Sequence, residues 1–180
     1  KPEPELLSSL DSAIPEILAS QKENGQFGTD PWISTDQNVL LTLAAGWSIE
    51  DSRYFGDDAV LASIIQGGQA LVDAQDEVGM FTFRKKDHST WGQIYMPWVY
   101  SRWARAYWLT REAFGSDDRK VWDEALTLGF QGISDTCFDR VHNIPTHDAM
   151  GIYFAALALD REDWKEQAVA FSHQVVDAQS

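Results

Sequence analysis

The sequence predicts an all-α fold, an incomplete (α/α) toroid built from helical hairpins of about 50 residues. Amphipathic helical segments alternate with segments that are apolar on nearly every side, and a short motif recurs as LASQKENGQF, LVDAQDEVGMF and VVDAQS. Its glutamines, Gln21, Gln75 and Gln179, are 54 and 104 positions apart, so a degenerate copy near Thr136 and Cys137 fits the register. Outer amphipathic and inner apolar helices would form a double-walled ring, with an open superhelix of helix pairs as the alternative.

The first hairpin begins with leucines and isoleucines at three- and four-residue spacing over residues 6–21. This spacing predicts an amphipathic helix with one buried stripe. The turn sequence QKENGQFGT follows. Ser34 and Gln37 then have the spacing of a capping box, and they precede VLLTLAAG, which predicts a buried helix that ends at Gly46.

The second hairpin repeats this order. Asp57 and Asp58 open an amphipathic helix that ends at Gln75, and the loop DEVGMFTFRKKDHS follows. Thr90 again stands three residues before a glutamine, Gln93, as in a capping box. We therefore expect an aromatic-rich inner helix over residues 91–109, kinked at Pro97.

The third hairpin carries an amphipathic helix around residues 122–133 and an apolar helix over residues 149–159. Pro145 is unfavourable inside a helix that begins before it, so Thr146 is the expected N-cap. A last amphipathic segment follows Asp160. Three and a half hairpins are too few to close such a ring, so residues 1–180 are expected to be the N-terminal part of a single toroid domain.

The composition excludes several classes of function. The chain has 28 acidic residues against 14 lysines and arginines, a net charge of −14, which argues against nucleic acid or an anionic membrane as partner. No apolar run approaches the roughly 20 residues of a membrane span. Cys137 is the single cysteine, and no His and Cys cluster has metal-ligand spacing, so we expect no disulfide, metal or cofactor. The opening KPEPELL has no methionine, and we expect a secreted or periplasmic protein.

In every hairpin, the loop containing Gly and Phe joins the end of an outer helix to the start of an inner one. These loops are therefore expected at one end of the barrel, which we call the loop rim. The other connections, GWSIEDSRYFGDD and TREAFGSDD, are acidic. Positive charge gathered on one end of an acidic protein implies an anionic ligand there. The loop rim collects Trp32, Asp36, Gln37 and Asn38 from the first loop, Arg84, Lys85, Lys86, His88 and Trp91 from the second, and Arg140, His142, Asn143 and His147 from the third.

The third loop opens directly into a helix N-terminus, where unpaired backbone N–H groups and the helix dipole favour an anion. Its alternative interpretation is a capped helix with ordinary polar neighbours. Trp91, Tyr95 and Trp98 likewise recur at helical spacing, which is typical of a core stripe, although aromatic faces near a helix start commonly stack on sugar rings. Residues 84–86 have the alternative interpretation of a solvated charge run.

The hairpin period and the Gln…Gly-Phe loops resemble the (α/α) toroid carbohydrate-active enzymes, above all polysaccharide lyases of the alginate lyase, heparinase-type and glucuronan lyase kind. The resemblance implies an acidic polysaccharide substrate that is cleaved by β-elimination. In that group an Asn with a nearby His neutralises the uronate carboxylate. Asn143 and His147 resemble that pair, with His142 as a further donor or base.

The same resemblance implies roles for the other loop-rim residues. Arg84, Lys86, His88 and Arg140 would hold neighbouring uronates, with Gln37 and Asn38 as further polar contacts. Trp32, Trp91 and Tyr95 would contact sugar faces. The catalytic Tyr and Arg of the family have no match here, and they are expected beyond Ser180.

Two other classes of function stay open. A toroid glycoside hydrolase would need paired carboxylates, for which Asp36, Asp87 and Asp148 are the loop-rim candidates. A non-catalytic helical-repeat scaffold that binds glycans is the other alternative. Terpene cyclases and prenyltransferase subunits also have Gln…Gly-Phe repeats, but they need Asp-rich motifs that this sequence lacks.

Overall fold

The computed structural model describes residues 2–28, 31–136 and 143–177. Within these ranges the chain is mostly helical, with one small two-stranded antiparallel sheet, so the all-α prediction is confirmed. The elements in chain order are α1 (Pro4–Ala19), the 3-10 helix η1 (Ser34–Asn38), α2 (Val39–Ser48), α3 (Asp58–Ala74), β1 (Phe81–Arg84), β2 (Thr90–Ile94), α4 (Pro97–Thr110), the 3-10 helix η2 (Arg111–Ala113), α5 (Ser116–Thr136), α6 (Asn143–Ala158) and α7 (Glu162–Asp177).

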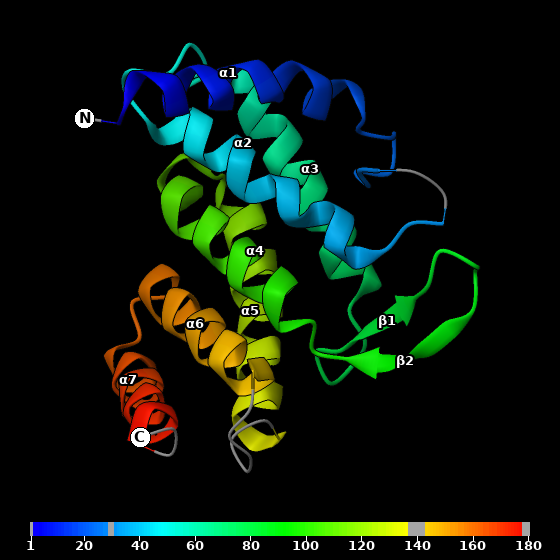
Figure 1. Cartoon of the computed structure of the whole chain (residues 1–180), viewed down its shortest axis with the longest axis vertical. Coiled ribbons are helices and arrows are strands. Elements are labelled where there is room, and N and C mark those ends of the chain that lie inside the picture. Colours follow the sequence, from blue (N-terminus) through cyan, green and yellow to red (C-terminus); the bar gives the residue numbers. More distant parts are fainter. Residues whose placement is uncertain (1, 29–30, 137–142, 178–180) are drawn as a thin grey trace.

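The helices form two layers. Helices α2, α4 and α6 lie side by side, with α4 packed between the other two. Figure 1 shows α3 and α5 behind this layer, while α1 lies along α2 and α7 lies along α6. The helices with apolar sequences therefore lie next to one another, and the amphipathic helices pack on them, as their one-sided stripes require.

An aromatic cluster joins the two layers. Trp122 of α5 lies against Trp103 of α4, with ring centroids 5.7 Å apart, and against Phe114, at 4.9 Å. Helix α3 approaches this cluster through Gly68, where an added Cβ would lie 1.8 Å from the Trp122 ring. Aromatic pairs of this kind contribute about 0.5–1.5 kcal/mol each beyond the area that they bury.

The repeated glutamine has a structural explanation. After α1, the Gln21 side-chain nitrogen donates hydrogen bonds to the carbonyl of the glycine four residues on, at 3.4 Å, and to the Ser63 carbonyl of α3, at 2.9 Å. After α3, Gln75 donates to the equivalent glycine carbonyl at 3.4 Å and to the Ala125 carbonyl of α5 at 3.2 Å. The two glutamines thus link the end of α1 to α3 and the end of α3 to α5.

The predicted inner helix over residues 91–109 is wrong at its start. Residues 90–94 form β2, which pairs with β1, and the helix begins at Pro97. The alternation of the sequence FTFR and the β-branched and aromatic residues of TWGQI favour strands, and these preferences outweigh the capping-box spacing. Pro97 is a favourable first helical residue, so it begins α4 and does not kink it.

Two other predicted boundaries differ from the structure. Helix α2 continues past Gly46 to Ser48, so Gly46 does not end the helix. The glycine instead makes room for Ile14, whose Cδ1 would lie 2.2 Å from an added Cβ. Helix α6 begins at Asn143, so that Pro145 lies in its first turn, where a missing N–H costs little. The residues that follow Pro145 are therefore helical and do not form a loop.

Candidate functional site

A cavity of about 390 Å³, which we call the β1 cavity, lies between strand β1 and the segment that precedes η1. Three residues predicted to bind substrate line it: Trp32 from the first loop, and Arg84 and His88 from the second. The strand alternation adds Thr82, which stands two residues before Arg84 on the same face of β1. Residues of the first and second loops thus line one cavity.

The Trp32 side chain is held in place by Gln37. The indole Nε1 donates to the Gln37 side-chain oxygen at 3.1 Å, and the same oxygen accepts a hydrogen bond of 2.8 Å from the Phe27 backbone N–H. The amide nitrogen donates to the carbonyls of Gly67, at 2.6 Å, and Gly25, at 3.2 Å.

This geometry corrects the prediction for Gln37. Its side chain is only 1% exposed, and both lone pairs and both N–H groups are used within the protein. It therefore has no group left for a substrate, nor does it form the predicted capping box with Ser34. Ser34 instead lines the β1 cavity, where its buried hydroxyl has no hydrogen-bond partner among the described residues.

The tight turn between β1 and β2 presents His88 to the cavity. Its backbone has a φ of 67°, and its N–H donates to the Lys85 carbonyl at 3.0 Å. The neighbouring Asp87 carboxylate accepts hydrogen bonds from the Ser89 hydroxyl, at 2.5 Å, and the Ser89 backbone, at 3.0 Å. These hydrogen bonds lower the pKa of Asp87. Asp87 is thus engaged within the turn and forms no ion pair with a described lysine or arginine.

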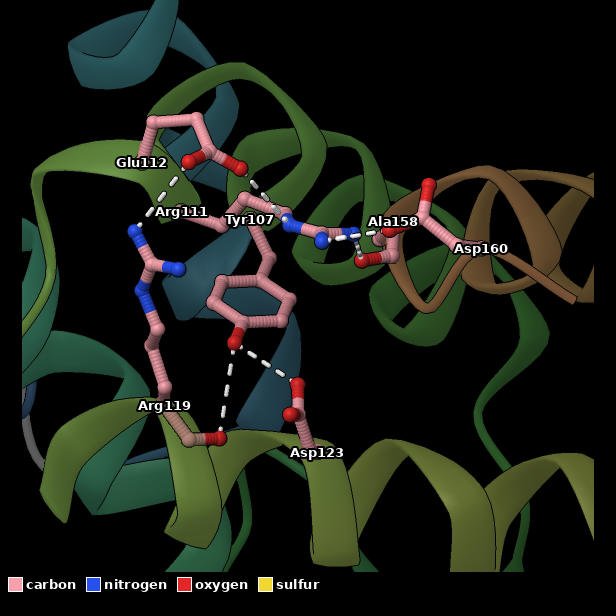
Figure 2. Close-up of polar contacts among 7 residues, drawn as sticks. All are labelled: Tyr107, Arg111, Glu112, Arg119, Asp123, Ala158 and Asp160. Atoms are coloured by element: carbon pink, nitrogen blue, oxygen red, sulfur yellow. Dashed lines mark hydrogen bonds and ion pairs between the residues drawn. The ribbon is translucent and has the colours of Figure 1, made fainter. Parts of the chain in front are cut away.

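Near the C-terminal end of α4, two arginines form ion pairs with carboxylates of the protein, as Figure 2 shows. Arg111 pairs with Asp160 at 2.5 Å and with Glu112 at 3.2 Å, and it also donates to the Ala158 carbonyl. Arg119 pairs with the same Glu112 at 3.3 Å. These contacts connect the ends of α4, α5 and α6, so they have a structural role.

The described lysine and arginine residues of the loop rim, in contrast, have no such partners among the described residues. Within residues 2–28, 31–136 and 143–177, six lysines and arginines form no ion pair. Four lie on the loops that follow α1 and α3, and two lie on α4. They are Lys22, Arg84, Lys85, Lys86, Arg102 and Arg105. Among the described residues, the positive charge that forms no ion pair is therefore concentrated on two neighbouring hairpins.

A second cavity, of about 280 Å³, lies between β2, the start of α4 and α6, and we call it the β2 cavity. Trp91 and Tyr95, both predicted to bind substrate, line it together with Trp98 and Asp148. Trp91 is 65% exposed, while Tyr95 is buried against Gly132, where an added Cβ would lie 2.3 Å from the ring. The Asp148 side chain is fully buried.

The remaining predicted residues are less closely grouped. Lys86 is exposed in the hairpin turn, and Asn38 lies in η1 with its side-chain oxygen buried and unpaired among the described residues; neither lines these two cavities. His147 is exposed on α6, one residue before Asp148, and also lines neither. The backbone of Asn143 begins α6.

Two further predicted residues, Arg140 and His142, lie outside the described residues, so the predicted catalytic group of the third loop stays a prediction.

Within the described ranges, no three His, Cys, Asp or Glu side chains are grouped so that they could hold a metal ion. None of the helices in those ranges is both long and apolar enough to cross a membrane. No protein-family model matches this chain, and no curated protein matches its sequence.

Proposed function

We propose that this chain is the N-terminal part of an (α/α) toroid enzyme that binds an acidic polysaccharide at the loop rim and cleaves it by β-elimination. The observation that carries the proposal is the β1 cavity, where Trp32, Arg84 and His88 from successive loops line one space. A guanidinium can hold a carboxylate through two parallel hydrogen bonds, and an indole face stacks on a pyranose ring. The neighbouring arrangement of α2, α4 and α6 supports an inner helical wall.

The same donors suit the chemistry of a uronate lyase. Removal of the C5 proton places negative charge on the carboxylate, and fixed hydrogen-bond donors at that group lower the barrier. In this proposal, Arg84 and His88 hold a uronate next to the reacting unit. Asn143 would donate to the reacting carboxylate, and His147 or His142 would act as donor or base.

A glycoside hydrolase is the second candidate, and the β2 cavity supports it. Of the three loop-rim carboxylates, Asp36 accepts a hydrogen bond from the Ile33 backbone, and Asp87 is bound to its own turn. Asp148 lines an aromatic cavity, the kind of environment in which a carboxyl group serves as a general acid. An inverting or retaining mechanism needs a second carboxylate across the cleft, which neither cavity has among its described lining residues.

The two candidates give different products. We would incubate the full-length enzyme, of which this chain is the proposed N-terminal part, with a panel of polyuronates and neutral polysaccharides and follow both ultraviolet absorbance and reducing ends. A lyase produces a C4–C5 double bond that absorbs in the ultraviolet, whereas a hydrolase produces reducing ends without that absorbance. Absence of both products from every polyuronate would contradict the enzymatic proposal.

Binding is tested separately with Arg84→Ala. We expect about a tenfold loss of affinity for an oligouronate, which corresponds to roughly 1.4 kcal/mol. The matched control is Lys120→Ala, which removes an exposed cation of α5 that is already close to Glu124, at 4.0 Å. Equal losses in the two variants would show that the effect is one of general charge and that the β1 cavity is not the site.

A further inference from the structure

A second group of cations and aromatic rings lies on α4 and α6, away from both cavities. The Arg105 guanidinium carbon is 5.0 Å from the centre of the Phe154 ring, and the Trp108 ring centre is 6.1 Å from the same ring. Arg105 is exposed, and Trp108 is 43% exposed. These side chains therefore combine an accessible guanidinium with accessible aromatic surface.

The positive charge of this group is not neutralised within the described residues. Arg105 forms no ion pair there, and neither does Arg102, whose guanidinium donates to the Trp98 carbonyl at 2.8 Å. Two like charges three positions apart on a helix repel each other, so the pair does not stabilise α4 by itself. Arg111, at the end of the same helix, shows the contrast, because two carboxylates pair with it.

These residues continue a line from the β2 cavity. Trp98 lines that cavity, and Arg102, Arg105 and Trp108 follow it along α4 at helical spacing. With a rise of 1.5 Å per residue, the ten positions from Trp98 to Trp108 span about 15 Å. Several sugar units in an extended chain would cover this distance, whereas a disaccharide would not.

We propose that Arg105, with Phe154 and Trp108, is a distal subsite for the acidic polysaccharide that binds at the loop rim; this inference rests on the proposed function. The Arg105 guanidinium carbon lies over the Phe154 ring within cation–π distance, and no described carboxylate pairs with this guanidinium, so its N–H groups can pair with a uronate carboxylate. Trp108 supplies an aromatic surface for a sugar ring. Arg102 binds the uronate between this subsite and the β2 cavity.

An anionic chain fits this surface better than an apolar covering does. A helix or a second copy that buried the surface with apolar side chains would remove the Arg102 and Arg105 guanidiniums from water without supplying acceptors, which is strongly unfavourable. An acidic polysaccharide supplies one carboxylate per uronate and leaves much of the surface hydrated.

The test uses the full chain and oligouronates of two lengths, a disaccharide and a dodecasaccharide, with affinities measured by calorimetry. We expect Arg105→Ala and Trp108→Ala each to weaken binding of the dodecasaccharide about tenfold and to leave disaccharide binding unchanged. Arg84→Ala is expected to weaken binding of both lengths. Arg105→Gln repeats the test with a polar side chain of similar length, and circular dichroism verifies that each variant is folded.

The possible results separate the two proposals. Loss of dodecasaccharide affinity in Arg84→Ala but not in the Arg105 and Trp108 variants would overturn the distal subsite and leave the proposed function intact. If neither oligouronate binds the unmodified chain, the proposed function itself is wrong. A change of molecular mass in sedimentation caused by Arg105→Ala, with dodecasaccharide affinity unaltered, would identify the surface as a contact between copies and would also overturn the subsite.

Discussion

The indole of Trp32 donates a hydrogen bond of 3.1 Å to the side chain of Gln37, so a buried amide fixes an aromatic ring at the wall of the β1 cavity. The same amide holds the Phe27 N–H and the Gly67 carbonyl. The candidate site and the fold therefore share one polar group, because the first loop is tied to α3 through the residue that orients Trp32.

Replacing Gln37 with methionine is expected to lower the free energy of unfolding by about 2–4 kcal/mol. Methionine keeps the volume, but it leaves the Phe27 N–H and the Gly67 carbonyl buried without their partner. Trp32 loses its acceptor as well, so oligouronate affinity should fall with stability. Urea denaturation followed by tryptophan fluorescence measures the first effect and calorimetry the second.

The matched control for Gln37→Met is Gln66→Met. Gln66 is exposed, and its side chain donates only to the Glu23 carbonyl, at 2.7 Å. We expect this substitution to cost no more than about 1 kcal/mol and to leave ligand affinity unchanged. Similar stabilities of the two variants would contradict the structural role of the buried amide.

The two repeated glutamines are expected to differ in their contribution to stability. Gln21 exchanges hydrogen bonds with Ser63, because it also accepts one of 2.6 Å from the serine hydroxyl. The equivalent partner of Gln75 is Ala125, which has no hydroxyl. Gln21→Leu should therefore destabilise the fold by about 1 kcal/mol more than Gln75→Leu does, as measured by thermal and urea unfolding. An equal or larger effect of Gln75→Leu would be inconsistent with this interpretation.

The amphipathic helices could be predicted from the sequence because each has one apolar stripe at helical spacing, which a helix buries on one side. The stripe over residues 6–21 became α1, and that over residues 122–133 became part of α5. The β1–β2 hairpin was missed because Thr90 and Gln93 have the spacing of a capping box. The alternation of Phe81, Thr82 and Phe83 indicated a strand, and the hydrogen-bonded pairing of β1 with β2 stabilises that strand.

For the candidate site, the sequence repeat could predict only which loops lie at the same end of the helices. That reasoning brought Trp32 together with Arg84 and His88. It could not show whether the Gln37 amide binds a ligand or supports the fold. The burial of Gln37 depends on Gly67, thirty residues away, because a Cβ added at Gly67 would lie 3.4 Å from the Gln37 side-chain nitrogen. Sequence spacing contains no information on such a contact.

Stability at acid pH is expected to depend on Asp11. Burial raises the pKa of this carboxyl, but hydrogen bonds from the Ser52 hydroxyl, at 2.7 Å, and from Arg53, at 3.3 Å, more than offset it, so the pKa is lowered in the folded state. A lowered folded pKa contributes stability that is present above the unfolded pKa, near 4, and is lost as pH falls through the folded value.

Asp11→Asn should therefore be less stable than the unmodified chain at neutral pH, by about 1–3 kcal/mol, and this difference should shrink as the pH falls below about 4. The free energy of unfolding in urea between pH 3 and 7 measures it. Comparing the two proteins at each pH cancels the titration of the other acidic residues. A difference that is constant over this range would show that Asp11 does not have a lowered pKa.

Stability at alkaline pH is expected to depend on Tyr107, whose hydroxyl donates to Asp123 at 2.7 Å (Figure 2). Burial, followed by the Asp123 carboxylate, raises the pKa of Tyr107 well above its usual value. Because the folded pKa is raised, the contribution of Tyr107 to stability is complete below the unfolded pKa, near 10, and is lost as the pH rises above it.

Tyr107→Phe should lower the free energy of unfolding by about 1–2 kcal/mol at pH 8, because Asp123 loses its hydrogen-bond donor. This difference should diminish between about pH 10 and 12, because only the unmodified chain then loses the Tyr107 proton on unfolding. Urea denaturation over this pH range measures the difference. The control at pH 8 is Tyr153→Phe, since that hydroxyl has no hydrogen-bond partner among the described residues and its removal should change stability little. If the Tyr107→Phe difference grew with rising pH, the assigned direction of the pKa shift would be wrong, because a group that ionises more readily in the folded state would stabilise the protein as the pH increased.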